Sequence, residues 1–258
     1  MSRIIAVANQ KGGVGKTTTV INLSALLAEA GKKVLTIDMD PQGNTSSGLG
    51  LDKDQLGRTV YQTLIGECSL TDCIEKSVMS GVSVVPSTVH LAGAEVELIG
   101  VAESQYILKK ELAGVKDAYD FILIDCPPSL NLLTINAMTA ADSVLVPIQC
   151  EYYALEGLSQ LLYTIELVQK SLNPALEIEG IVFTMYDVRT NLSLQVVENV
   201  KKYFRHHIFR TVIPRNVRLA EAPSHGLPIN LYDSRSAGAE SYRKLAQELI
   251  RKSSQPAK

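Results

Sequence analysis

Short apolar runs alternate along the chain with stretches in which apolar residues recur at helical spacing. The apolar runs predict strands over residues 4–8, 33–37, 82–85, 121–124, 144–148 and 178–184. Runs that are apolar throughout are typical of strands that a parallel sheet buries on both faces. Because strands and helices alternate, the pattern predicts an α/β fold with a doubly wound, mostly parallel sheet.

Helical spacing predicts helices over residues 17–30, 155–170, 191–204 and 237–251, a helical stretch over 91–113, and short helices within 59–81. Residues 41–58 are rich in Gly, Ser, Asn and Asp, which predicts a loop, either a plain surface loop or one that changes conformation. No internal repeat or linker divides the chain. We therefore expect one domain over residues 1–258, without an N-terminal helix-turn-helix extension.

The composition, 46% hydrophobic and 20% charged residues, is that of a folded globular protein and excludes a disordered chain. The four cysteines form no C-x-x-C pair and no signal peptide precedes them, so we expect reduced thiols and a cytoplasmic location. No run of 18 apolar residues occurs, and we expect no membrane-spanning segment.

The clearest chemical motif lies at residues 3–18, which read R-I-I-A-V-A-N-Q-K-G-G-V-G-K-T-T. A glycine-rich loop between a strand and a helix lets backbone N–H groups converge on phosphate oxygens, and the helix N-terminus adds partial positive charge. In such a loop Lys16 reaches the β- and γ-phosphates and the Thr17 hydroxyl binds Mg²⁺. The motif therefore predicts a nucleoside triphosphate and Mg²⁺ as ligands.

The loop departs from the usual phosphate-binding spacing, because Gln10 stands where that pattern has glycine and a second lysine, Lys11, follows. Lys16 already serves the bound phosphates. Lys11 is therefore either a solvated loop lysine or directed at charge that belongs to another site.

Two further motifs place carboxylates after strands. Asp125 ends the apolar strand 121–124, as a Walker B aspartate does, and is predicted to bind Mg²⁺ together with Thr17; the alternative is a cap for the turn before Pro127. Asp38 and Asp40 share one face of an extended segment, and either is placed to orient an attacking water. Spacing alone does not separate them.

Four strings, K-G-G-V-G-K-T-T, D-x-D-P-Q-G-N, I-D-C-P-P and L-A-E-A-P-S-H-G-L-P-I, together resemble the ParA/Soj branch of the deviant Walker A P-loop ATPases, which also include MinD and nitrogenase iron protein. The resemblance covers nearly the whole chain. It implies a chromosome-partitioning Mg²⁺-ATPase in which ATP joins two subunits, the homodimer binds double-stranded DNA non-specifically, and hydrolysis releases it. It also implies a ParB-type partner whose basic N-terminal segment stimulates hydrolysis, and a replication initiator as a further partner.

The resemblance also assigns roles to single residues. It implies that Lys11 crosses to the partner subunit's ATP and that Asp40, rather than Asp38, orients the attacking water, so that Lys11, Lys16 and Asp40 are the catalytic residues. The implied nucleotide contacts are Lys11, Gly12, Gly13, Val14, Gly15, Lys16, Thr17 and Thr18. Adenine is expected between Met185 and Pro214, with Asn216 at the edge of the base; the alternatives are core packing for Met185 and a turn for Pro214.

Basic residues concentrate in one window of a chain whose net charge is −2. Between Arg189 and Arg218 there are seven basic residues and one acid, Glu198, so this window carries +6 and the remainder −8. The residues predicted to contact DNA are Arg189, Lys201, Lys202, Arg205, Arg215 and Arg218. A local basic surface predicts phosphate-driven, non-specific DNA binding and a nucleoid-associated location; a solvated helix face is the alternative.

Three other functions fit the same scaffold less well. A MinD-like membrane-positioning ATPase ends in a lipid-binding amphipathic helix, but residues 245–258 hold few apolar residues and no aromatic one. An iron–sulfur reductase would need a cysteine shortly after the Asp125 motif, and this chain has Leu, Leu and Thr at positions 132–134. A metabolic kinase or amide ligase would need an acceptor pocket, which residues 86–116 have room to provide.

Overall fold

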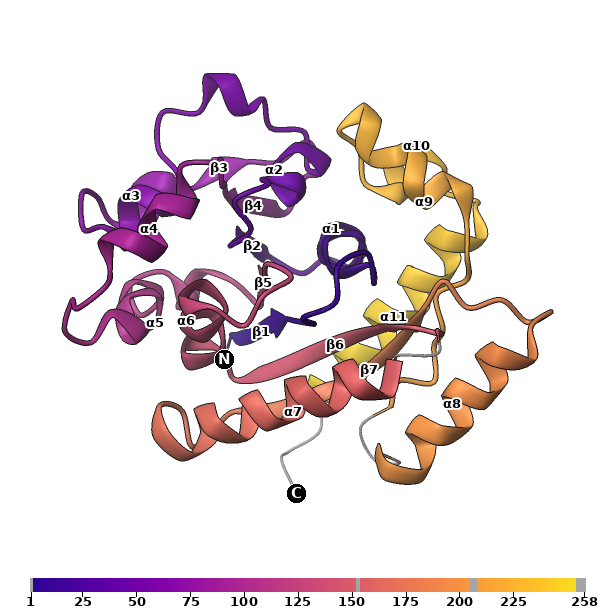
Figure 1. Ribbon diagram of the computed structural model, residues 1–258. Coiled ribbons are helices and arrows are strands. Elements are labelled where there is room, and N and C mark those ends of the chain that lie inside the picture. Colours follow the sequence, from indigo (N-terminus) through magenta and orange to yellow (C-terminus); the bar gives the residue numbers. More distant parts are fainter. Residues whose placement is uncertain (1, 152–153, 205–207, 254–258) are drawn as a thin grey trace.

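Seven strands form one sheet in the order β3-β4-β2-β5-β1-β6-β7, and all neighbouring pairs except β3–β4 are parallel. The computed structural model describes residues 2–151, 154–204 and 208–253 (Figure 1). The strands are β1 (Arg3–Val7), β2 (Val34–Asp38), β3 (Glu75–Lys76), β4 (Val82–Val85), β5 (Phe121–Asp125), β6 (Ser143–Gln149) and β7 (Glu177–Thr184).

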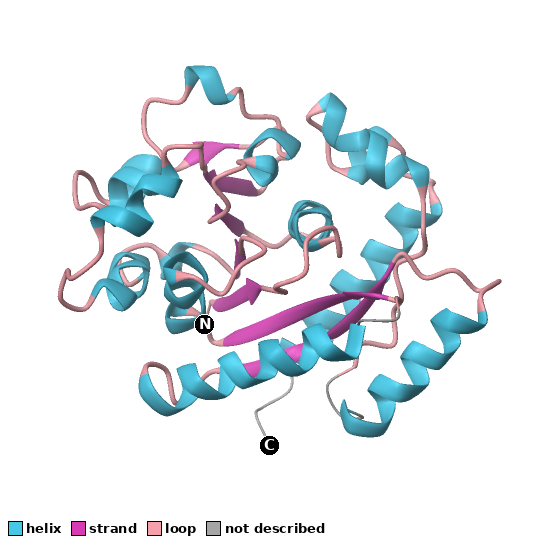
Figure 2. Cartoon of the chain, viewed as in Figure 1, coloured by secondary structure: helices cyan, strands magenta, loops and turns pink. Residues whose placement is uncertain are grey.

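Helices cover both faces of this sheet (Figure 2). They are α1 (Lys16–Glu29), α2 (Asn44–Gly48), α3 (Val60–Leu64), α4 (Leu91–Glu97), α5 (Ile107–Leu112), α6 (Leu132–Ala140), α7 (Ala154–Ser171), α8 (Asn191–Phe204), α9 (Val217–Glu221), α10 (Ile229–Tyr232) and α11 (Ala237–Ser253). None of the helices in the described part of the chain combines the length and apolar character that crossing a membrane requires.

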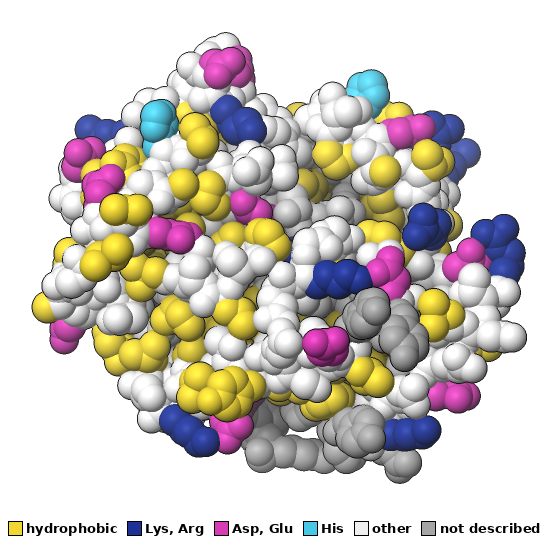
Figure 3. Space-filling view, viewed as in Figure 1, with side chains coloured by type: hydrophobic (Ala, Val, Ile, Leu, Met, Phe, Trp, Pro, Cys, Tyr) yellow, Lys and Arg dark blue, Asp and Glu magenta, His cyan; other side chains and the backbone are white. Residues whose placement is uncertain are grey.

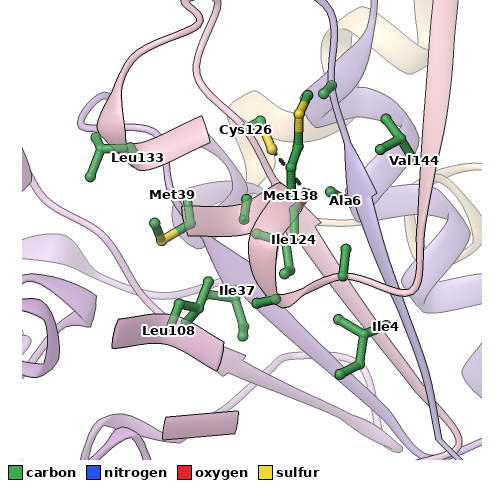
Figure 4. Close-up of a cluster of buried hydrophobic side chains, with 14 of the residues drawn as sticks. Ile4, Ala6, Ile37, Met39, Leu108, Ile124, Cys126, Leu133, Met138 and Val144 are labelled. Atoms are coloured by element: carbon green, nitrogen blue, oxygen red, sulfur yellow. Dashed lines mark hydrogen bonds between the residues drawn. The ribbon is translucent and has the colours of Figure 1, made fainter. Parts of the chain in front are cut away.

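Strand periodicity divides the core into two layers. In β1, Ile4 and Ala6 point to one face of the sheet, whereas Ile5 and Val7 point to the other. The first layer packs under α3 to α8, and the second under α1 and α11. Figure 4 shows part of the first layer, in which strand residues meet helix residues; the labelled side chains are Ile4, Ala6, Ile37, Met39, Leu108, Ile124, Cys126, Leu133, Met138 and Val144. The central strands are thus fixed from both sides.

The doubly wound, mostly parallel sheet is confirmed, and the helices predicted over 17–30, 155–170, 191–204 and 237–251 lie within a few residues of α1, α7, α8 and α11. The four cysteines are free, as expected. The edge strand β3 runs antiparallel to β4 and had no counterpart among the predicted strands. Helices α6, α9 and α10 were also missed.

Two of the predicted segments differ in part from the structure. Residues 41–58 are not only loop, because α2 begins at Asn44 and packs so closely on α1 that a Cβ at Gly48 would lie 2.3 Å from Ile21 Cδ1. Tertiary packing here overrides a loop-like composition. The stretch 91–113 is two helices rather than one, because Gly100 and Glu103 take positive φ angles of 77° and 57° between α4 and α5.

Helix α11 closes over the helix that follows the glycine-rich loop. The Tyr242 hydroxyl lies 3.1 Å from Thr19 Oγ1, and both side chains are buried. At the surface, Arg243 Nε donates to Glu29 Oε1 at 2.7 Å. The C-terminal helix therefore holds α1 in place through one buried and one exposed polar contact.

We expect Tyr242→Phe to lower the free energy of unfolding by about 1–2 kcal/mol, because Thr19 Oγ1 then loses its buried partner. Urea unfolding followed by circular dichroism measures this, with the exposed Tyr163→Phe as the control. The double variant Tyr242→Phe/Thr19→Val should recover part of the loss. An unchanged midpoint for Tyr242→Phe would show that this contact contributes nothing.

Candidate functional site

The glycine-rich loop joins β1 to α1 at the carboxyl edge of the sheet, where open α/β folds bind their ligands. Gly13 and Gly15 have φ angles of 74° and 87°, which side-chain-bearing residues rarely adopt. Asn9 anchors the loop, since its Nδ2 donates to Pro147 O at 2.8 Å and its Oδ1 accepts from Lys11 N at 3.0 Å. No side chain caps the N-terminus of α1, so its first backbone N–H groups are free to bind an anion held by the loop.

The two lysines of the loop lie in different environments. Lys16 is buried, and its Nζ donates to Lys11 O at 3.3 Å. Burial lowers the Lys16 pKa, while the Asp125 carboxylate opposes that change. Lys11 is partly exposed and forms an ion pair with Glu151, which also accepts from Gln149 Nε2. Lys16 therefore points into the loop, and Lys11 lies at its outer side.

Space surrounds the outer side of the loop. A cavity of about 490 Å³ is lined by Gln10, Lys11, Pro128, Ser129, Leu130, Glu156, Gly157 and Gln160. A Cβ built on Gly12 meets no atom within 4 Å. A side chain at position 12 would consequently project from the surface of the monomer without a clash.

Two carboxylates are buried side by side, because the parallel register pairs Asp38 of β2 with Asp125 of β5. Asp125 Oδ2 accepts from Thr17 Oγ1 at 2.8 Å and from Thr45 Oγ1 at 2.6 Å. Asp38 Oδ2 accepts from the backbone N and the Oγ of Ser46 at 2.8 and 2.7 Å. Hydroxyl groups from α1 and from α2 thus donate hydrogen bonds to the two carboxylates.

The surroundings raise the pKa of both carboxyls. Burial, followed by repulsion from Asp38, raises the pKa of Asp125 to about 7. Burial raises the pKa of Asp38 to about 6, against the opposing effect of its hydrogen bonds from Ser46. Negative charge at this edge is costly unless a cation compensates it.

The donor set fits a magnesium ion. Asp125 Oδ1 is buried and has no hydrogen-bond partner, while its other oxygen contacts the Thr17 hydroxyl. Within the described residues no group of three or more His, Cys, Asp or Glu side chains forms a metal cluster. Mg²⁺ suits such a site, because it binds through few protein oxygens and keeps phosphate and water as its remaining ligands.

Asp40 differs from Asp38 in how firmly it is held. Its Oδ1 accepts from Gln42 N at 3.0 Å, and it is slightly exposed, whereas Asp38 is fully buried and accepts three hydrogen bonds. Since Asp38 is already occupied, the geometry favours Asp40 as the carboxylate that reaches a water. Its catalytic role stays a prediction.

The three residues expected around adenine lie together. A cavity of about 380 Å³ beside the loop is lined by Gly15, Thr18, Thr184, Met185, Ile213, Pro214, Arg215, Asn216, Val217, Leu219, Ala220 and Tyr242. Met185 has a left-handed φ of 49°. The next residue, Tyr186, donates its backbone N–H to Ile213 O at 3.0 Å and so joins this segment to residues 213–215. Asn216 Oδ1 caps α9 by accepting from Arg218 N at 2.9 Å. The contact of these residues with adenine stays a prediction.

Sequence reasoning missed several residues that shape the site. Thr184 Oγ1 donates to Val14 O at 2.7 Å and so ties the end of β7 to the loop. Thr45 bonds to Asp125 from a segment predicted to be loop, and Asn9 anchors the strand end. A polar residue at or directly after the end of a buried strand, such as Thr184 or Asn9, was the available signal.

The basic residues form an exposed set over α8 and α9, at one edge of the face in Figure 3. Two of its arginines are paired with nearby acids. Arg189 donates to both oxygens of Asp187 at 2.9 and 2.7 Å, and Arg218 NH1 to Glu221 at 2.9 Å. Lys201, Lys202 and Arg215 are exposed, whereas Arg205 lies outside the described residues.

Comparison with known proteins gives consistent relatives. A sequence family described as an AAA domain matches residues 2–178. Sporulation initiation inhibitor protein Soj of Bacillus subtilis is 59% identical over 249 residues, 96% of this chain and 98% of that protein. Chromosome-partitioning ATPase Soj of Treponema pallidum is 54% identical over 255 residues, 99% of this chain and 100% of that protein. Among solved structures, Mycobacterium smegmatis cobyrinic acid a,c-diamide synthase with bound ADP and magnesium has a TM-score of 0.86 at 40% identity, covering 97% of this chain and 95% of that one.

The raised carboxyl pKa values predict how stability depends on pH. Between pH 4 and about 7 the folded metal-free chain binds more protons at Asp38 and Asp125 than the unfolded chain, so its free energy of unfolding falls as pH rises through that window. Asp125→Asn removes part of this dependence, and we expect it to be more stable than the parent chain at pH 8 by about 1–3 kcal/mol. Urea unfolding in EDTA from pH 5 to 8.5 measures the difference. A difference between variant and parent that stays constant over this range would contradict the buried-pair account.

Proposed function

Because the chain belongs to the Soj/ParA family of chromosome-partitioning ATPases, we propose that it hydrolyses ATP with Mg²⁺ and couples the nucleotide state to dimerisation and DNA binding. The observation that carries the nucleotide part is the unpaired, buried Asp125 Oδ1 next to Thr17, at the mouth of an uncapped helix that a glycine loop precedes. This combination serves a phosphate-bound cation and has no evident structural purpose without one.

In this proposal the backbone N–H groups of residues 12–17 and Lys16 bind the phosphates, and Thr17 and Asp125 hold the cation. Mg²⁺ neutralises charge that develops on the phosphate oxygens during transfer. Asp40 orients the attacking water, while Met185, Pro214 and Asn216 bind adenine in the cavity beside the loop. Burial of Lys16 keeps its cationic head in a site from which water is partly excluded, where its attraction to phosphate is stronger.

Dimerisation is assigned to Lys11. Its ion pair with Glu151 joins side chains that are 37% and 43% exposed, and such a pair contributes only about 0–1 kcal/mol. A triphosphate presented by a second subunit carries several negative charges and would displace Glu151 as the partner of Lys11. The ATP of one subunit then supplies the attraction that holds its twin.

DNA binding is assigned to the basic residues over α8 and α9, supported by their exposure. The ion pairs of Arg189 and Arg218 are also solvent-exposed, so their cations remain available to phosphate at small cost. Two such surfaces on one dimer bind far more tightly than one, because the second contact is intramolecular. The dimer is therefore expected to bind DNA independently of sequence, and to release it when hydrolysis separates the subunits.

The family further implies a ParB-type partner that stimulates hydrolysis, a replication initiator as a second partner, and association with the nucleoid. These belong to the proposal because the Treponema pallidum relative is named a chromosome-partitioning ATPase.

A MinD-like membrane function is disfavoured by α11. Its apolar residues Ala239, Tyr242, Leu245, Ala246 and Leu249 are buried in the layer that α1 completes. The helix therefore has no free apolar face with which to lie on a bilayer.

A metabolic amide ligase is the second candidate, since a cobyrinic acid a,c-diamide synthase superposes closely. The region 86–116 that would supply an acceptor pocket instead sends Leu91, Leu98 and Leu112 into the core. Together with the higher identity to the Soj relatives, this favours partitioning.

Gly12→Val is expected to fold and bind ATP but to remain monomeric, because the added side chain meets nothing in the monomer and projects where a twin would approach. Sedimentation velocity with a non-hydrolysable ATP analogue measures this. Gly57→Val, at a site equally free of neighbours and remote from the loop, is the matched control and should dimerise. A dimeric Gly12→Val would contradict the close approach of the two loops.

Asp40→Ala is expected to bind ATP and dimerise but to hydrolyse it about 10²-fold or more slowly, because no carboxylate orients the water. Phosphate release measures turnover, and sedimentation confirms the dimer. Asp40→Asn, which keeps the bond from Gln42 N, should be nearly as slow. Hydrolysis at the parent rate in either variant would remove Asp40 from the mechanism.

Arg189→Glu is expected to lose most DNA affinity while still dimerising with ATP, and to lower the dependence of log Kd on log salt by about 1–2 for each subunit. Fluorescence anisotropy with duplexes of unrelated sequence, at several salt concentrations, measures both quantities. Arg58→Glu is the control, because Arg58 is also exposed and paired with an aspartate, Asp72, but belongs to another part of the surface. Equal loss in both variants would mean that net charge, not this surface, decides binding.

A further inference from the structure

Helix α4 and the turns on either side of it expose apolar side chains in one row. Val89, Val96 and Ile99 are 70%, 70% and 76% exposed, and Ala92 between them is exposed as well. Their spacing, 89, 92, 96 and 99, is that of one face of a helix. We call these four residues the α4 stripe.

The inner face of the same segment is also apolar, since Leu91, Ala94 and Leu98 are buried in the core. A helix that is apolar on both faces is expected to be covered on both. The stripe continues to Val101, which is 47% exposed. Several large apolar side chains exposed on one short segment favour a contact with another molecule.

The charge around the stripe is negative. Residues 77–108 contain no Lys or Arg. The Glu95 and Glu97 carboxylates accept hydrogen bonds from Asn131 and from the Tyr61 hydroxyl, and within the described part of the chain neither pairs with a Lys or Arg. Glu103, by contrast, is paired with Lys110 at 2.6 Å. Figure 3 shows this side of the face, over α3 and α4, with hydrophobic and acidic side chains intermixed.

These charges decide between occupants. DNA and anionic lipid would be repelled by Glu95 and Glu97. A second copy joined through the same surface would bring those carboxylates towards each other, because a two-fold contact sets like against like. An apolar segment flanked by cations satisfies both the stripe and the carboxylates.

We propose that the α4 stripe docks an amphipathic helical segment of a partner protein, with apolar residues at i, i+3 or i+4 and i+7 and with Lys or Arg beside them. The assignment of that partner rests on the proposed function, in which a second protein with a basic segment stimulates hydrolysis. The surface itself is defined by this chain alone.

The stripe lies next to both segments that reach the carboxylate pair. Glu95 accepts a hydrogen bond from Asn131, which lies six residues after Asp125 in the chain. Asn131 Oδ1 in turn caps α6 by accepting from Thr134 N at 3.3 Å. At the other end of α4, Ser87 N donates to Ser46 Oγ at 3.0 Å, and Ser46 holds Asp38. A segment bound to α4 is therefore linked to Asp38 through Ser87 and Ser46, and through Glu95 and Asn131 to the segment that follows Asp125.

The test uses a labelled 20-residue helical peptide with Leu at i, i+3, i+4 and i+7 and Arg beside them, and a second peptide in which Glu replaces each Arg. Anisotropy is measured without nucleotide or DNA. We expect binding of the Arg peptide only, and a Kd about 10-fold or more higher for Val96→Ser/Ile99→Ser. Glu95→Gln/Glu97→Gln keeps the hydrogen bonds to Asn131 and Tyr61, and should weaken binding about 3-fold or more and reduce its salt dependence.

The matched control is Tyr163→Ser/Leu167→Ser on α7, which removes side chains that are 63% and 45% exposed beside Glu166, and it should bind within about twofold of the parent chain. Equal binding of both peptides, or equal affinity of all variants, would overturn the proposal. The proposal would also be overturned if the parent chain dimerised without nucleotide in sedimentation and Val96→Ser/Ile99→Ser abolished that dimer. The occupant of the stripe would then be a second copy of the chain.

A second arm separates this inference from the proposed function. Basal ATPase activity of Val96→Ser/Ile99→Ser should equal that of the parent chain, while stimulation by the purified ParB-type protein of the same organism should be lost. If the parent chain shows neither ATPase activity nor DNA binding, the proposed function fails and the peptide result still decides the docking surface. If the ParB-type protein stimulates parent and variant equally, the proposed function stands and the docking inference is wrong.

Discussion

Two carboxylates buried side by side impose the constraint on which the site depends. The register of β2 against β5 sets Asp38 and Asp125 next to each other at the carboxyl edge of the sheet, in the region from which water is excluded. Thr17, Thr45 and Ser46 donate to them and offset part of the cost. One oxygen, Asp125 Oδ1, remains unpaired. The fold thus retains an unfavourable arrangement that a cation bound at Asp125 would relieve, so that binding would stabilise this edge.

The same edge explains why two lysines of one loop serve different purposes. Lys16 is enclosed by the loop and faces the carboxylates, so its charge belongs to the site of its own chain. Lys11 lies outside, beside open space, in an ion pair that solvent weakens. A cation held so loosely is available to a second molecule. In the proposed function, burial of Lys16 and exposure of Lys11 separate nucleotide binding from subunit pairing within a stretch of six residues.

The sequence predicts the sheet and the position of the loop, because continuous apolar runs and a glycine-rich strand-to-helix turn carry their own physical signature. It does not predict that Asp38 and Asp125 are neighbours, since the order of strands in a sheet is not encoded in local periodicity. Helix α2 was missed for a related reason: Ser and Gly favour a loop locally, yet contact of Gly48 with Ile21 fixes a helix that delivers Thr45 and Ser46. The pairing of Arg189 with Asp187, two residues before it, is a local contact that was missed because the basic window was read from Arg189 onward. What local chemistry decides was predictable, and what tertiary contact decides was not.

DNA affinity of the parent chain, measured at one salt concentration without nucleotide, with ADP and with ATP, tests the central claim most directly. The claim is that the triphosphate of one subunit recruits Lys11 of another, and that pairing doubles the basic surface. The account predicts tight binding with ATP and weak binding in the other two states. Equal affinity in all three states would contradict it.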